Sequence, residues 1–255
     1  MIGRQAGVFR STLGRLAVAI AFVAGDPAAW PSTVEAAGLL DEASCVDIEA
    51  PVLEVPAGAE WAREPVDARA RAVAVALCRV LDARPDDPWS IRLHVDLESF
   101  LRANPLAAEV GGVVGGSRRS RDRADVVIPA RPDDEASWDS TVRYEVGRLL
   151  VLRRAGARLP DVWVDATADY LAGRSADRAA GVARLRTVWS EGRLPTWTAV
   201  SASDGSYIDP PLVRPMALSA LHFLTERYGF EQWLDTLDAV AAGRPLETAV
   251  QSVLG

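Results

Sequence analysis

The stretch from Thr141 to Gly173 constrains the fold of this chain more than any other part of its sequence. Apolar residues recur there at helical spacing on both sides of Leu159-Pro160, which predicts two helices joined by a turn. The first predicted helix contains Tyr144-Glu145-Val146-Gly147-Arg148 in front of an apolar run, and the second contains Asp165. We expect the rest of the chain to be organised around this helix pair.

Three segments before the helix pair have the patterns of strands. In the middle one, Ile91–Leu97, the alternating pattern places Ile91, Leu93, Val95 and Leu97 toward the core and Arg92, His94 and Asp96 toward solvent. Four glycines between positions 111 and 116 predict a bent hairpin leading to the last strand. We therefore predict a small, mainly antiparallel sheet whose strands lie in Val46–Val55, Ile91–Leu97 and Ala124–Pro129.

The remaining strong patterns are helical. An apolar face runs through Asp67–Ala83, and a short helix is expected from Glu98 to Asn104. The fold class is therefore α+β, with a sheet-containing part at 46–140 and a helical part at 141–255, together one domain over 26–255. Other predicted helices are Ser32–Leu40, Ala176–Trp189, Pro215–Tyr228, Phe230–Ala241 and Pro245–Leu254, with Gly229 and Gly243 as stops.

The strings YEVGR at 144–148 and DATADY at 165–170 resemble the active-site core of the gluzincin metallopeptidases, the thermolysin-like or peptidase MA-like group. In that family the first helix holds H-E-x-x-H and the second holds a glutamate followed by G-x-A-x-Y. The strings TERYGFEQWL at 225–234 and GRPLETA at 243–249 resemble the helical tail of the same family. The resemblance covers about residues 50 to 250 and implies a sheet packed on zincin-type site helices.

The resemblance implies that Tyr144 and Arg148 fill the histidine positions, that Asp165 fills the position of the glutamate ligand, and that Glu145 keeps the general-base position. A neutral phenol is a poor zinc ligand, and a guanidinium has no lone pair to offer. We therefore expect no metal and no other cofactor. One hypothesis is that Arg148 bridges Glu145 and Asp165 where the metal would lie. In the other, Tyr144, Glu145 and Arg148 are a partly exposed helix face without a joint role.

The two histidines, His94 and His222, do not restore a metal site, because neither has a partner at ligand spacing. The sequence predicts a catalytically inactive gluzincin-like pseudopeptidase with a binding or structural role. Its expected partner is a peptide or another protein in the former substrate cleft. The alternatives are an active metallopeptidase with atypical ligands and a hydrolase of another class on the same scaffold. A net charge of -7 argues against nucleic acid as a partner.

Residues 1–25 have the order of a secretory signal: arginines, a short apolar run, then small residues. This predicts export, and the competing interpretation is a leader helix of a cytoplasmic protein. The apolar run is too short to cross a bilayer, so no integral membrane span is expected. Cys45 and Cys78 fit either a disulfide in an exported protein or two buried thiols in a cytosolic one.

Overall fold

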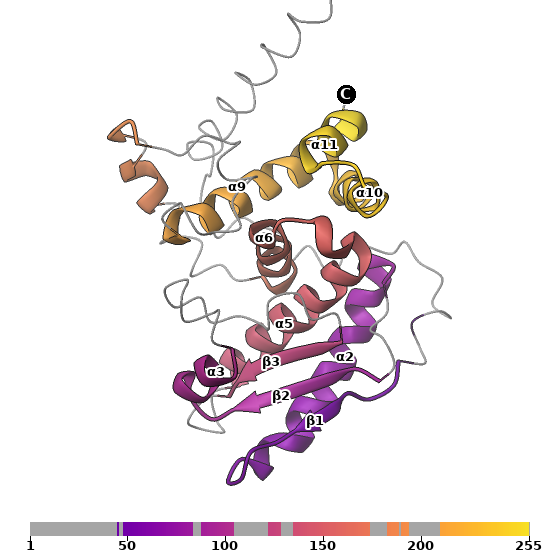
Figure 1. Cartoon of the computed structure of the whole chain (residues 1–255), viewed down its shortest axis with the longest axis vertical. Helices are drawn as coiled ribbons and strands as arrows, with labels where there is room; N and C mark the ends of the chain where they lie inside the picture. The colour runs from indigo at the N-terminus through magenta and orange to yellow at the C-terminus, as the bar shows by residue number, and fades with distance from the viewer. Residues whose placement is uncertain are drawn as a thin grey trace, which may run out of the picture.

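The computed structural model describes residues 45, 48–83, 88–104, 122–128, 135–173, 183–188, 190–193 and 210–254. The leader at 1–25, the helix at Ser32–Leu40 and the glycines at 111–116 lie outside these residues. The described chain is a mixed α/β structure, mainly helical, with one small sheet. Figure 1 shows the sheet at one end and α5 (Glu135–Ala155) and α6 (Asp161–Ala172) in the middle. The helices at the other end are α9 (Pro210–Tyr228), α10 (Phe230–Ala241) and α11 (Leu246–Leu254).

The sheet has the order β1-β2-β3, and both neighbouring pairs are parallel. Helix α2 (Arg63–Leu81) connects β1 to β2, and α3 (Leu97–Ala103) lies between β2 and β3. Crossovers of this kind bring the chain back to the same end of the sheet, as parallel pairing requires. The predicted antiparallel sheet is therefore wrong, and a hairpin cannot join β2 to β3. The strands are β1 (Val52–Glu54), β2 (Ser90–His94) and β3 (Arg123–Val127).

Strand β2 ends earlier than the alternating pattern predicted. Asp96 leaves the sheet and caps α3, where its Oδ1 accepts a 2.7 Å hydrogen bond from the Ser99 amide. Val95 and Leu97, predicted to face the core, are consequently 44% and 41% exposed. His94, predicted to face solvent, is buried instead.

One face of the sheet packs against helices α2 and α5 (Glu135–Ala155), and these elements share the main hydrophobic core. Ile91 and Leu93 from β2 enter this core with Val126 from β3. Leu77 of α2 also lies close to Gly147 of α5, where an added Cβ would be 3.4 Å from the Leu77 Cδ1 atom. The sheet therefore supports α5 from one side.

The helical half follows the sequence prediction in part: α5 begins at Glu135, before the predicted start near Thr141. Of the predicted helix Ala176–Trp189, the structure describes residues 183–188, which are helical. Helix α5 ends in a short 3-10 turn, η5 (Gly156–Arg158), and α6 (Asp161–Ala172) runs to Gly173, whose φ is 65°. Gly229, with φ of 94°, separates the next two helices. The helices on either side of Gly229 are α9 (Pro210–Tyr228) and α10 (Phe230–Ala241), and α11 (Leu246–Leu254) follows them. A second 3-10 turn, η4 (Glu60–Ala62), precedes α2.

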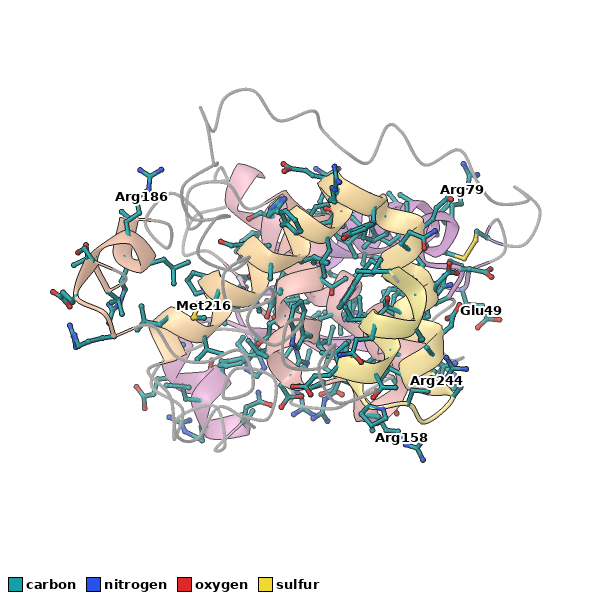
Figure 2. The ribbon with its side chains drawn as sticks, turned by 90° about the horizontal axis from the view of Figure 1, so that it is seen from above. Glu49, Arg79, Arg158, Arg186, Met216 and Arg244 are labelled. Carbon is teal, nitrogen blue, oxygen red and sulfur yellow. A yellow bond between two sulfur atoms is a disulfide. The ribbon has the colours of Figure 1, made fainter. Side chains whose placement is uncertain are left out.

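A disulfide and an arginine side chain connect α2 to distant parts of the chain. Cys78 of α2 forms a disulfide with Cys45, and their Cα atoms are 5.9 Å apart (Figure 2, yellow bond). Arg154 of α5 donates to the last carbonyl of α2, that of Leu81, and makes two hydrogen bonds of 2.8 and 2.7 Å to the Asp238 carboxylate on α10. In the part of the chain that the structure describes, no helix has the length and apolar character needed to cross a membrane.

Candidate functional site

Helices α5 and α6 are in contact at Gly147, where an added Cβ would have ordinary van der Waals contacts with its neighbours. A Cβ added at Gly147 would be 3.8 Å from the Ala168 Cα atom. Tyr144, Glu145 and Arg148 lie beside this contact and are 0%, 3% and 4% exposed. These values exclude the alternative of a partly exposed helix face at these three positions.

Asp165 of α6 accepts hydrogen bonds from two of the predicted site residues. The Tyr144 hydroxyl donates to Asp165 Oδ1 at 3.0 Å, and Arg148 Nε donates to the same oxygen at 2.9 Å. The Arg148 side chain is 5% exposed and that of Asp165 is 18% exposed. The Arg148–Asp165 half of the predicted bridge is thus confirmed, and the interpretation of this cluster as a former zinc site stays a prediction.

Glu145 acts on the cluster through its charge. Burial alone would lower the pKa of Arg148, but the negative charge of Asp165, together with Tyr144 and Glu145, raises it above its usual value. Burial and the charge of Asp165 raise the pKa of Tyr144 well above its ordinary value. Arg148 is therefore a permanent cation here, and Tyr144 is a neutral phenol that donates its proton to a hydrogen bond.

Sequence reasoning missed two further members of the cluster, Arg214 and Asp169. Arg214 of α9 forms a bidentate salt bridge with Asp169 of α6, with Nε–Oδ2 and Nη2–Oδ1 distances of 2.5 Å each. The Arg214 guanidinium carbon also lies 4.9 Å from the centre of the Tyr144 ring, as in a cation–π contact. Asp169 could have been suspected, because it lies one helical turn after Asp165. No local pattern marks Arg214.

The arginines balance the aspartates in this polar cluster. Burial would lower the pKa of Arg214, but its contacts with Tyr144, Asp169 and Asp165 raise it above the usual value. Each carboxylate therefore faces a fixed cation in a poorly hydrated place, where pairing compensates for lost solvation. Such an arrangement joins α5, α6 and α9 through paired charges.

The histidines lie in other contacts. His94 is 4% exposed, and its Nε2 lies 2.8 Å from Asp125 Oδ1 on the neighbouring strand. Burial would raise the pKa of Asp125, but the His94 hydrogen bond and the charge of Arg123 bring it below its usual value. His222 lies against the Tyr170 ring, with 4.9 Å between ring centres. Within the described residues, no three His, Cys, Asp or Glu side chains are grouped to hold a metal ion.

No protein-family model, curated protein or solved structure matches this chain. The function must therefore be argued from the polar cluster itself.

Proposed function

We propose that this protein is a non-catalytic relative of the gluzincins, in which the Arg148 guanidinium takes the place of the metal ion. The observation on which the proposal depends is the shared acceptor: Arg148 Nε and the Tyr144 hydroxyl both donate to Asp165 Oδ1. In the family pattern these three positions supply zinc ligands. A cation held by the same positions would keep the helices together without offering a Lewis acid.

The chemistry of the three side chains supports this interpretation. Zinc binds atoms with available lone pairs, whereas Arg148 carries only donors and repels cations. Tyr144 would have to lose its proton to ligate zinc, and its raised pKa opposes that loss. Asp165 alone remains as an ordinary ligand, and a catalytic zinc site has three protein ligands.

The role that remains is binding or structural support, with a peptide or another protein as the partner. The side chains of the cluster are mostly buried and paired, which favours a contribution to stability over proton transfer. Glu145, at the general-base position, is buried beside Arg148, whose pKa its charge helps to raise. A base that is held near a fixed cation is poorly suited to accept a proton.

The experiment rebuilds the family's ligand set by combining Tyr144→His, Arg148→His and Asp165→Glu. We expect the folded triple variant to bind one zinc ion per chain by calorimetry, and the wild-type protein to bind none. A control with Asp67→His and Arg71→His places a histidine pair at the same spacing on an exposed face of α2, where Arg71 and Asp67 now form an ion pair. This control measures the weak affinity of any such pair.

Two results would contradict the proposal. A folded triple variant that binds zinc no better than the α2 control would show that these positions are not arranged as the family's ligands. Stoichiometric zinc in the wild-type protein, together with chelator-sensitive hydrolysis of casein, would instead favour the active metallopeptidase with atypical ligands.

A further inference from the structure

A second hydrophobic cluster lies apart from the main core, at the N-terminal end of α9. It joins two residues of the helical segment 183–188 to three residues of α9, and Val162 of α6 packs against it. Figure 1 shows this segment beyond the end of α9, far from the sheet, and Figure 2 shows Arg186 on its outer side. The buried members of the cluster are Leu185, Val188, Leu212, Val213 and Met216.

Arg214 lies in the same turn of α9 as Leu212 and Val213, but it contacts the polar cluster. Its pair with Asp169 and its position over the Tyr144 ring join the N-terminal turns of α9 to α6 and α5. The Arg214 side chain is 26% exposed, so solvent ions reach one side of the pair. The N-terminal end of α9 is thus fixed to the polar cluster by an ionic contact that solvent can reach.

Pro215 follows Arg214 immediately and lies inside α9. A proline has no amide hydrogen, so the backbone hydrogen bond from residue 215 to the carbonyl of residue 211 is missing. Helices bend and open most readily at such positions. The first turns of α9 can therefore move relative to the rest of the helix, which is packed in the main core through Ala217, Leu218 and Leu221.

We propose that residues 183–188 and 210–214 move together as a lid that carries Arg214 off the polar cluster, with Pro215 as its hinge and the Arg214–Asp169 pair as its latch. Opening of the lid moves Arg214 away from Tyr144. It leaves the Arg148–Asp165 pair in place, because Arg148 lies on α5 and Asp165 on α6, outside the lid. The lid controls whether a partner can reach the Tyr144 side of the polar cluster, which Arg214 now covers, so its role rests on the proposed function. The movement of the lid does not depend on that function.

Hydrogen exchange measured on the full-length protein tests the lid. We expect the amides of 183–188 and 212–214 to exchange together, and faster than those of α5 and α6, because a small unit opens without global unfolding. Arg214→Gln removes the charged latch and should speed this exchange about 10- to 100-fold, with α2, α10 and α11 unchanged. Arg154→Gln breaks a similar bidentate salt bridge, to Asp238, outside the lid and should leave the exchange rates of the lid amides unchanged.

A second variant tests the hinge and remains informative if Arg214→Gln does not fold. Pro215→Ala restores the missing amide and should slow exchange of the lid about tenfold or more. The proposal is overturned if neither variant changes the lid's exchange, or if Arg214→Gln speeds exchange equally in all helices. These readouts need no metal, so failure of the zinc experiment and failure of the lid are separate results.

Discussion

Replacing Arg148 with Met tests how strongly the polar cluster depends on its cation. Methionine fills much of the space but leaves the Asp165 carboxylate with the Tyr144 hydroxyl as its remaining donor among the contacts described above. Breaking a buried ion pair costs roughly 3–5 kcal/mol of folding free energy. Asp165 is 18% exposed and keeps one hydrogen bond, so we expect the lower part of that range, about 3 kcal/mol.

The same reasoning predicts a partial rescue. Asp165→Asn removes the negative charge that Arg148→Met leaves without its cation. It keeps a side-chain oxygen that accepts the hydrogen bond from the Tyr144 hydroxyl. The Arg148→Met and Asp165→Asn double variant should therefore be more stable than Arg148→Met alone, by about 1–2 kcal/mol. Urea unfolding followed by tryptophan fluorescence gives both free energies, and far-UV circular dichroism checks that a single transition is seen.

An exposed pair provides the control for this comparison. Arg71 and Asp67 form an ion pair on α2 with side chains 50% and 25% exposed, so Arg71→Met should change stability by less than about 0.5 kcal/mol. A loss of less than about 1 kcal/mol in the free energy of unfolding for Arg148→Met would refute the inference that Arg148 holds the cluster together. A double variant less stable than Arg148→Met alone would refute it as well.

Two further predictions concern Tyr144 and the disulfide. Because the pKa of Tyr144 is raised in the folded state, the unfolded chain loses the phenol proton at a lower pH than the folded protein does. The contribution of Tyr144 to the free energy of unfolding is therefore complete below about pH 10. Above that pH the contribution falls by about 1.4 kcal/mol per pH unit. Urea titrations from pH 9 to 11 should show the wild type losing its advantage over Tyr144→Phe, and parallel curves would contradict this. The Cys45–Cys78 disulfide closes a loop of sequence separation 33 and should contribute roughly 3–4 kcal/mol. Reductant, or Cys45→Ala with Cys78→Ala, should lower the urea midpoint accordingly, and an unchanged midpoint would mean that the bridge does not form.

The helices were predictable because their signals are local. Apolar spacing and the glycines at 173 and 229 identified α5, α6, α9 and α10, but two starts were misplaced: α5 begins at Glu135 instead of near Thr141, and α9 begins at Pro210 instead of Pro215. Proline is favoured at the start of a helix and costly inside one, so the sequence favoured Pro215 as the first residue of α9, whereas it lies inside the helix.

The errors in the sheet have a common physical cause. Alternation indicates which strand positions share a face, but it contains no information about the direction of the neighbouring strand. His94 was assigned to solvent because its partner, Asp125, lies on a different strand. Val95 and Leu97 were assigned to the core because the capping role of Asp96, which ends the strand, was not recognised.

The polar cluster was predicted in part. Tyr144, Arg148 and Asp165 came from the resemblance of two adjacent helices to a known pattern, and the structure brings these three side chains into contact. Arg214 joins them from a third helix, and its pair with Asp169 spans 45 positions of sequence. Contacts of this range depend on how helices pack and leave no periodic signal in either segment.

The order of the sheet has a consequence for how the chain is assembled during synthesis. Because β1, β2 and β3 are neighbours in the order of the sequence, each strand can pair with its predecessor as it leaves the ribosome. The sheet and α5 can form while α9 has not yet been made. Until Arg214 arrives, Asp169 lacks this partner and the Tyr144 ring is not covered by it. The polar cluster is therefore completed only after α9 has been synthesised, so the Arg214–Asp169 pair cannot guide the earlier steps of folding.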